Sequence, residues 1–462
     1  MTEMLSHATI PQLRSCLDRG DLNAVELVRA ALARIAATED QIQAFAAVFA
    51  DEALAVAQQQ AESDAPTGAL TGIPLVVKDI YDVGGYRTGN GSLGTPDQVA
   101  AIDSEAVRRL RTAGAIVIGK ATTHEYAYGV NTPPTRNPWS TGRIPGGSSG
   151  GTGAAIAAGV TTAGLGTDTG GSIRIPAALC GVTGHKPTFG MVSRRGVSAL
   201  SSTLDHTGPL GRTVTDTVEL LEVIAGHDPQ DPYSSASPVS DLRAEFDRGM
   251  AGLTIGVAEE FFCDRLTPDV ATTFESAVRT LEGAGATIRR VEFTDVELSS
   301  DVVKVVCGVE ATAWHDMQVG TNPEAFGPDV VDALTVGRAY SGVDYLAALR
   351  ARAAVIAGMD ALFDSGIDLL VSPTTPMTAP AFGATEVPFG GETTPLLWAI
   401  NALTVPANVT GMPALTVPAG FGSDGLPIGL QLMGRPGADA VVLGAGHAFE
   451  ALAGCVDIPL PL

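Results

Sequence analysis

The sequence predicts an α/β protein with a single large domain, in which helices cover both faces of a mixed, mostly parallel β-sheet. Two observations predict this fold. Segments with a helical spacing of apolar residues alternate along the chain with short apolar runs of strand length. The 462 residues contain no solenoid repeat and no low-complexity tract that would mark a linker, so we expect one domain over residues 1–462.

The N-terminal part, residues 1–65, is expected to form a helical arm that packs on this domain. Residues 21–35 place Val25, Val28 and Leu32 at helical spacing behind an Asp or Asn cap. Residues 51–62, DEALAVAQQQAE, are expected to form more helix.

The pattern then changes to strands that alternate with helices. Residues 72–79, GIPLVVKD, form an apolar run that predicts a buried strand with Lys78 at its end. Residues 103–121 predict a helix, a stop at Gly114 and a strand, and residues 272–293 repeat this order. Further strand-sized runs bounded by Gly or Pro lie at residues 366–373, 413–421 and 427–434.

Composition and charge limit the classes of function that this chain can have. The formal net charge is −23 and the pI is near 4.6, which argues against nucleic acid as a partner, because its binding grooves are built from Lys and Arg. No apolar run approaches the ~20 residues that cross a bilayer, and we expect no signal peptide and no membrane partner. Five cysteines without a CxxC pair indicate reduced thiols and a cytoplasmic protein, with Cys180 as a buried thiol.

A glycine- and serine-rich stretch, PGGSSGGTGAAIAAG, occupies residues 145–159. It does not fit a phosphate-binding loop, because no Lys follows the glycines and no strand precedes them. Gly147, Ser149 and Gly151 satisfy G-x-S-x-G, but a nucleophile elbow needs a strand where Pro145 stands. Neither interpretation is favoured.

A second loop of this kind, GLGTDTGGSIRIPAALCG, follows at residues 164–181 and argues against a simple linker. It presents Thr169, Gly170, Gly171 and Ser172 in succession. Consecutive small residues leave backbone N–H groups free to converge on an anion, as an oxyanion hole requires. The sequence therefore indicates a serine-based acyl-transfer site.

Such a site needs a base, and no motif marks any of the seven histidines. Lys78, at the end of its apolar strand, is the other candidate, because desolvation lowers the pKa of a lysine and lets the neutral amine act as a base. From the residues alone, an ion pair of Lys78 with Asp79 or Asp82 is an equally good interpretation.

Taken together, these motifs resemble the amidase signature family. The resemblance begins with residues 72–92 and 119–139 and is densest over residues 145–216. It implies a Ser-cisSer-Lys triad in which Ser172 is the nucleophile, Ser148 follows a cis peptide bond and bridges, and Lys78 is the base. Backbone N–H groups from Thr169 to Ser172 would form the oxyanion hole, and neither a metal nor an organic cofactor is implied.

Two more residues fall on family positions within these motifs. Ser149 is expected to support the loop around Ser148. Arg174 either pairs with Asp168 to brace the oxyanion loop or meets a substrate carboxylate, and we favour bracing.

The choice of substrate is the least determined part. The family includes small-amide hydrolases, aryl acylamidases, carbamate and allophanate hydrolases, peptide amidases and the glutaminase subunit of tRNA-dependent amidotransferases. That glutaminase branch holds the glutamine amine with an acidic residue where this chain has Asn401. Trp398, Tyr126 and Tyr128 are candidates for an apolar pocket wall.

We therefore expect an amidase for small, mostly uncharged amides, aryl amides, anilides and carbamates included. The alternatives are the glutaminase subunit of a tRNA-dependent amidotransferase and an allophanate-type hydrolase. The expected partner is the small-molecule substrate. Many family members are dimers, so the resemblance implies a homodimer as the oligomeric state.

Overall fold

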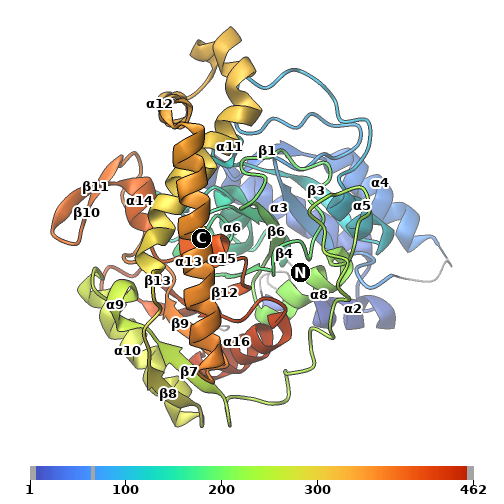
Figure 1. The fold of residues 1–462 in the computed structure, drawn as a ribbon. Helices are drawn as coiled ribbons and strands as arrows, with labels where there is room; N and C mark the ends of the chain where they lie inside the picture. The colour runs from blue at the N-terminus through green and yellow to red at the C-terminus, as the bar shows by residue number, and fades with distance from the viewer. Residues whose placement is uncertain (1–6, 64–67, 455–462) are drawn as a thin grey trace.

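The computed structural model describes residues 7–63 and 68–454, so parts of the expected arm over residues 1–65, and Cys455, lie outside the described residues. Within the described residues, eleven strands form one sheet in the order β1-β3-β2-β4-β6-β5-β12-β13-β9-β7-β8. Its strands are β1 (Phe45–Val48), β2 (Pro74–Lys78), β3 (Ile116–Ala121), β4 (Ala163–Asp168), β5 (Thr183–Lys186), β6 (His206–Gly211), β7 (Thr254–Val257), β8 (Thr287–Arg290), β9 (Leu369–Pro373), β12 (Ala414–Phe421) and β13 (Pro427–Met433). A separate hairpin, on the left of Figure 1, consists of β10 (Glu386–Phe389) and β11 (Glu392–Pro395).

Helices connect and cover these strands. The α-helices are α2 (Ile10–Arg19), α3 (Ala24–Ile42), α4 (Ala50–Ala61), α5 (Glu105–Thr112), α6 (Gly150–Ala157), α7 (Arg174–Cys180), α8 (Val214–Ile224), α9 (Glu259–Phe262), α10 (Pro268–Gly283), α11 (Ser299–Thr321), α12 (Pro328–Ala339), α13 (Gly342–Asp364), α14 (Leu396–Ile400), α15 (Val405–Thr410) and α16 (Asp439–Ala453). Short 3₁₀ turns are η1 (Glu125–Ala127), η2 (Val296–Leu298) and η3 (Pro323–Ala325).

The sheet is mixed, as the sequence predicts, but its parallel pairs are confined to two groups. Strands β3, β2 and β4 are parallel neighbours, and so are β9, β7 and β8. From β4 to β9 each described neighbour pair is antiparallel. The reason is local connectivity: β12 and β13 form a hairpin, and β6 runs back between β4 and β5. The predicted predominance of parallel strands therefore applies only to the two groups.

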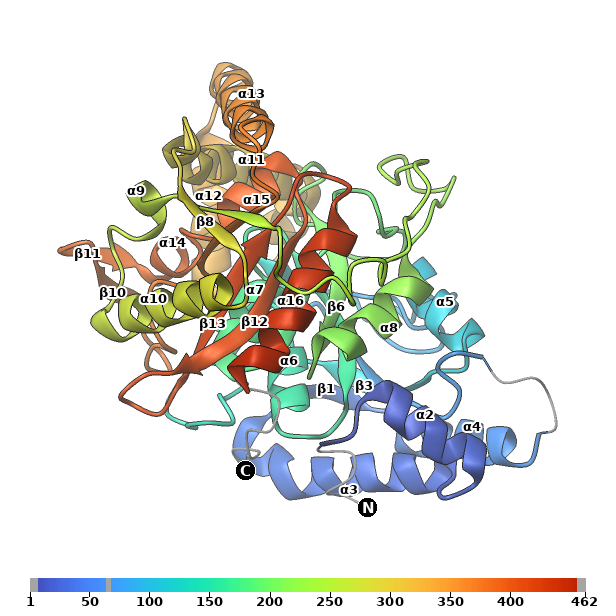
Figure 2. The ribbon, with the colours of Figure 1, turned by 90° about the horizontal axis from the view of Figure 1, so that it is seen from below.

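The two faces of the sheet carry different helices, as strand β5 makes clear. A Cβ at Gly184 would contact Ala177 of α7, whereas the next residue, His185, reaches Asp439 of α16. Because successive strand residues point to opposite faces, α7 and α16 lie on opposite sides of the sheet. Figure 2 shows α8, α10 and α16 across one face. Helices α6 and α7 pack on the other, and Figure 1 shows α11 and α13 on the same side of the molecule as α15.

The N-terminal segment is mostly helical, but it also contributes a strand. Capping boxes begin α2 at Thr9 and α3 at Asn23. In each, the side chain of the N-cap residue accepts the backbone N–H of the N3 residue, and the N3 side chain accepts the backbone N–H of the N-cap residue. Between α3 and α4, β1 pairs antiparallel with β3 and forms one edge of the sheet. Arg34 of α3 donates to the carbonyl oxygen of Ala158 at 2.6 Å, which ties this segment to the end of α6.

The ends of two parallel strands locate the candidate site. In β2 and β4, Val76 pairs with Gly164 and Val77 with Leu165. The carboxyl ends of parallel strands lie at the same edge, so Lys78 and Asp168 end there together. No helix in the described part of the chain is long and apolar enough to cross a membrane.

Helix α6 approaches the sheet closely because Gly151 has no side chain. A Cβ at this position would lie 2.5 Å from the backbone N and O of Thr122 and 2.6 Å from the carbonyl oxygen of Ala44. We expect Gly151→Ala to lower the free energy of unfolding in urea by roughly 1–3 kcal/mol, because backbone atoms cannot give way as side chains do. The matched control is Gly320→Ala in α11, where no atom lies within 4 Å of the added carbon. It should stabilise the protein by about 0.5–1 kcal/mol, and equal effects of the two changes would contradict this account of α6.

Candidate active site

Lys78 lies at the end of a strand that is buried along its whole length, and the lysine itself is fully buried. Its Nζ donates to Ser148 Oγ at 2.7 Å and to Thr167 Oγ1 at 2.8 Å. The amine is therefore held between two hydroxyl groups, one from the first glycine-serine loop and one from β4.

Burial lowers the pKa of Lys78 to about 7, against the opposing charges of Asp168 and Asp205. An ammonium group loses hydration energy in such a site, and hydroxyl partners do not restore it as a carboxylate would. A substantial fraction of Lys78 is therefore a neutral amine near pH 7, which is what a general base requires.

The two acidic residues that follow Lys78 in the sequence have other partners. Asp79 Oδ1 pairs with Lys120 Nζ of β3 at 2.8 Å, and Asp82 accepts a hydrogen bond from the hydroxyl of Thr88. Asp79 is the first residue after β2, and its carboxylate is directed at Lys120. The interpretation of Lys78 as an ion-pair partner of Asp79 or Asp82 does not describe the structure.

The first glycine-serine loop holds Ser148 and Ser149 by backbone contacts. The Gly147–Ser148 peptide bond is cis. The N–H of His124 donates to the carbonyl oxygen of Ser148, and the hydroxyl of Thr132 donates to that of Gly146. Ser149 is fully buried; its Oγ lies 3.2 Å from both N and O of Thr167, and its N–H donates to the carbonyl oxygen of Ser172. Ser149 therefore joins the two loops.

The second loop is shaped by the carboxylate of Asp168, which accepts the N–H of Gly171 at 2.8 Å and that of Ile173 at 3.2 Å. Gly171 has φ of 126°, and a Cβ there would lie 2.3 Å from Thr404 Oγ1, so only glycine fits. The same Thr404 hydroxyl donates to the carbonyl oxygen of Gly170 at 2.7 Å.

One predicted oxyanion-hole donor is corrected by this geometry. The N–H of Gly171 is directed at Asp168 and not into the site. Within the described residues, the N–H groups of Thr169, Gly170 and Ser172 have no protein acceptor. Sequence reasoning missed the difference because the four residues are equivalent as small residues in a row.

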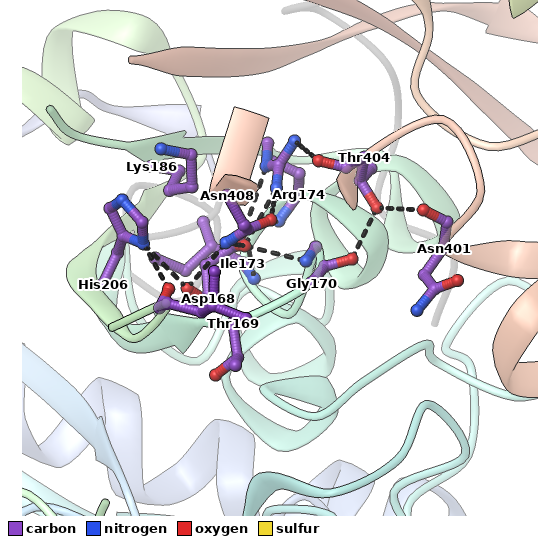
Figure 3. Close-up of polar contacts among 12 residues, drawn as sticks. Asp168, Thr169, Gly170, Ile173, Arg174, Lys186, His206, Asn401, Thr404 and Asn408 are labelled. Carbon is purple, nitrogen blue, oxygen red and sulfur yellow. Dashed lines mark hydrogen bonds and ion pairs between the residues drawn. The ribbon is translucent and has the colours of Figure 1, made fainter. Parts of the chain in front are cut away.

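Arg174 and Asp168 form an ion pair that is completely buried. Nε and Nη2 of Arg174 each lie 2.9 Å from a carboxylate oxygen of Asp168, and its other bonds reach Thr404, Asn408 and Gln431 (Figure 3). Burial raises the pKa of Asp168, but the charge and hydrogen bonds of Arg174, the charge of Lys186 and the hydrogen bond from Asn408 together hold the pKa well below its usual value. Arg174 is thus positioned to brace the loop and has no exposed surface with which to meet a substrate carboxylate.

A pocket opens beside Ser172, whose side chain is 7% exposed. We call it the Ser172 pocket, and it is lined by Ala127, Tyr128, Gly129, Val130, Thr169, Gly170, Ser172, Ile175, Leu200, Val303, Cys307, Leu397, Trp398 and Asn401. Every one of these residues in the described part of the chain is uncharged. The pocket can therefore receive an uncharged group next to Ser172.

The predicted substrate-binding residues divide into two groups. Tyr128, Trp398 and Asn401 line the Ser172 pocket. Tyr126 does not: its hydroxyl lies 2.9 Å from that of Thr95, and its ring stacks on Phe326. The interpretation of Tyr126 as a wall of this pocket is therefore corrected, because its ring packs against His315 and Phe326.

Ser149 and Arg174 lie behind the loops that they hold and are not among the lining residues of the pocket.

Several residues at the site were not singled out from the sequence. Thr167 accepts from Lys78, Asp205 accepts the hydroxyl of Thr169 at 2.6 Å, and Asn408 donates to Asp168. Thr167 lies one position from Asp168, inside the second glycine-serine loop. Asn408 ends residues 398–408, WAINALTVPAN, the segment that contains Trp398 and Asn401. Both residues therefore lie in segments that the sequence analysis had already selected. Among residues 7–63 and 68–454, no group of three or more His, Cys, Asp or Glu is placed to hold a metal ion.

Comparisons with known proteins agree with this geometry. A family model described as Amidase matches residues 26–443. Among curated proteins, the chain is 38% identical over 480 residues to the A subunit of the glutamyl-tRNA(Gln) amidotransferase of Roseiflexus sp. (strain RS-1), covering 97% of this chain and 96% of that protein.

Two solved structures are similar over nearly their whole length. One, reported as a vestigial protein complex that reveals the evolutionary origins of an s-triazine catabolic enzyme, has a TM-score of 0.92 and 35% identity and covers 96% of this chain and 98% of its own. The other is a bacterial aryl acylamidase of the amidase signature enzymes, with a TM-score of 0.89, 25% identity and coverage of 98% and 99%.

Removing the charge of Asp168 would leave the Arg174 guanidinium buried without a counter-ion. We expect Asp168→Asn to lower the free energy of unfolding by about 3–5 kcal/mol in urea denaturation. The matched control is Glu259→Gln, which breaks a 2.7 Å pair with Arg290 whose side chains are 59% and 60% exposed. That change should cost less than about 1 kcal/mol. An equally small loss for Asp168→Asn would show that the buried pair does not hold the loop.

Proposed function

The chain belongs to the amidase signature family and is an amidohydrolase, and on that premise we propose that it hydrolyses small, mostly uncharged carboxylic amides through an acyl-enzyme on Ser172. The observation that carries this proposal is the Ser172 pocket, an uncharged pocket that opens directly on the loop of Ser172. The Lys78–Ser148 contact of 2.7 Å supports the roles of the other two residues.

The proposed reaction begins with proton transfer. The neutral amine of Lys78 accepts the proton of Ser148 as Ser148 accepts that of Ser172, and Ser172 Oγ attacks the carbonyl carbon of the amide. The contacts of Lys78 Nζ with Thr167 Oγ1 at 2.8 Å and with Ser148 Oγ at 2.7 Å hold the amine within reach of the proton of Ser148.

Negative charge then develops on the carbonyl oxygen. The N–H groups of Thr169, Gly170 and Ser172 are the donors that we assign to it, and each such donor is typically worth about 3–4 kcal/mol in the transition state. The relay returns the proton to the leaving nitrogen, the C–N bond breaks, and water later hydrolyses the ester on Ser172.

A second candidate is the glutaminase subunit of a tRNA-dependent amidotransferase. The similarity to curated amidotransferase subunits over nearly the whole chain favours it. The pocket disfavours it, because the α-ammonium and α-carboxylate of glutamine would each need a charged partner, and the lining residues are uncharged. The same absence of a cation among these lining residues disfavours an allophanate-type substrate, which carries a carboxylate.

The nucleophile is tested by amide hydrolysis with a small panel. The panel contains benzamide, an acyl anilide, an aryl carbamate, a dipeptide amide and glutamine, and release of ammonia or amine is measured. We expect the wild type to hydrolyse uncharged members better than glutamine, and Ser172→Ala to lower kcat by more than about 1000-fold. Ser276→Ala, at an exposed position of α10, is the matched control and should keep full activity. Retained activity in Ser172→Ala would refute the acyl-enzyme, and glutamine as the preferred substrate would favour the second candidate.

The base is tested by the dependence of kcat/KM on pH. Protonated Lys78 cannot accept a proton, and burial lowers its pKa to about 7, so the rate should rise with pH and level off above that value. Between pH 6 and pH 9 we expect an increase of about tenfold for benzamide, and Lys78→Met should remove both the activity and this rise. A profile that is flat over this range, with chemistry shown to be rate-limiting, would exclude Lys78 as the base.

A further inference from the structure

A second cavity adjoins the Ser172 pocket and is considerably larger. It occupies about 240 Å³, compared with about 30 Å³ for the Ser172 pocket, and the two share Ala127, Thr169 and Leu200 in their walls. The Ser172 pocket is the smaller of the two, so it suits the smaller group of the substrate, a short acyl group. The room for a bulky part of the substrate is on the other side of Thr169.

The second cavity lies on the side of the site where the proton relay ends. Thr167, whose hydroxyl is 2.8 Å from Lys78 Nζ, lines it, and so does Ile80, two residues after Lys78. Neither Thr167 nor Ile80 lines the Ser172 pocket. In amide hydrolysis the relay protonates the leaving nitrogen, so this nitrogen must lie on the relay side while the acyl group lies on the other.

The charged residues in the wall of the second cavity already have partners. Asp205 accepts the hydroxyl of Thr169 and the N–H groups of Leu200 and Ser201. Arg195 pairs with Glu105 at 2.5 Å and with Asp228 at 2.8 Å. An occupant therefore meets few uncompensated charges.

Arg194 contacts carbonyl oxygens and aromatic rings rather than a carboxylate, and aromatic side chains complete the wall. Its guanidinium lies 4.5 Å from the ring centre of Tyr233 and donates to the carbonyl oxygen of Ser202. Trp314, on α11 and 57% exposed, stands at the rim, where its indole N–H donates to Ser202 Oγ. Apolar and aromatic walls with satisfied charges fit an uncharged organic group.

We propose that the second cavity binds the leaving amine, so that the preferred substrate is an N-substituted amide with a short acyl group and a bulky, uncharged amine. This inference rests on the proposed function of the Ser172 site. In the step concerned, the bond from Ser172 Oγ to the acyl carbon forms and the C–N bond breaks. Ser148 takes the proton of Ser172 and gives its own to Lys78; when the C–N bond breaks, Ser148 gives a proton to the nitrogen and regains one from Lys78. The free amine leaves through the second cavity.

The test compares acetanilide with acetamide, which share the acetyl group and differ only in the amine. The wild type should give a kcat/KM at least about tenfold higher for acetanilide. Ser198→Phe, which narrows the second cavity at a half-buried wall position, should lower kcat/KM for acetanilide by about tenfold or more and change that for acetamide less than about twofold. Ser276→Phe on the exposed face of α10 is the matched control and should change neither value.

A second variant and a binding measurement test the cavity without relying on Ser198→Phe alone. Trp314→Ala should also weaken the preference for acetanilide over acetamide. Because Trp314 is exposed, we expect this variant to fold. Aniline should bind the wild type in calorimetry and bind Ser198→Phe at least about tenfold more weakly. Equal losses for both substrates, or a wild type that prefers acetamide, would overturn the assignment of the cavity. Failure to hydrolyse either substrate would overturn the proposed function, and this inference with it.

Discussion

The site depends on one constraint, which is that Lys78 is buried among hydroxyl groups and its acidic neighbour is directed elsewhere. An ion pair with Asp79 would hold the amine as an ammonium group, and the relay would have no base. Lys120 prevents this by pairing with Asp79 just after the end of β2, where the pair is itself almost fully buried. The partner that Lys120 provides for Asp79 therefore matters to the proposed chemistry as much as the burial of Lys78.

The second requirement is a rigid oxyanion loop, and here a buried charge is used in the opposite way. Asp168 stays ionised because Arg174 pairs with it, and its oxygens then hold the loop backbone at Gly171 and Ile173. Arg174 in turn bonds residues of α15 and β13, Asn408 and Gln431, so the loop is fixed by segments more than 200 residues further along the chain. Lys78 and Asp168 are both fully buried at the ends of neighbouring parallel strands. Burial lowers the pKa of Lys78 to about 7, whereas Arg174 helps to hold that of Asp168 well below its usual value.

The sequence was sufficient where local pattern decides the structure. The strand ending at Lys78, the stop at Gly114 with φ of 90° and the helix–glycine–strand order over residues 272–293 all follow from apolar spacing and glycine, and the structure contains them. The sequence was insufficient where contacts between distant segments determine the structure. The N–H of Gly171 donates to Asp168, a carboxylate that Arg174 and Asn408 hold in place, and Tyr126 packs on Phe326 and does not line the pocket. The antiparallel middle of the sheet depends on which strands become neighbours, which apolar runs alone do not specify.

The division between the framework and the substrate walls explains why the reaction is easier to infer than the substrate. Lys78, Thr167 and Asp168 belong to central strands, where a change would disturb the packing of both faces of the sheet. The loops of Thr169 and Ser172 form one side of the two cavities, and much of the remaining wall comes from other segments, namely the loop before β6, the loop after α8 and helices α11 and α14. Because these segments cover the catalytic loops without forming them, they can change size and charge while the relay stays intact. Family membership therefore indicates the class of bond that is cleaved, whereas in our proposal the cavities on the two sides of Thr169 select the groups that this bond joins.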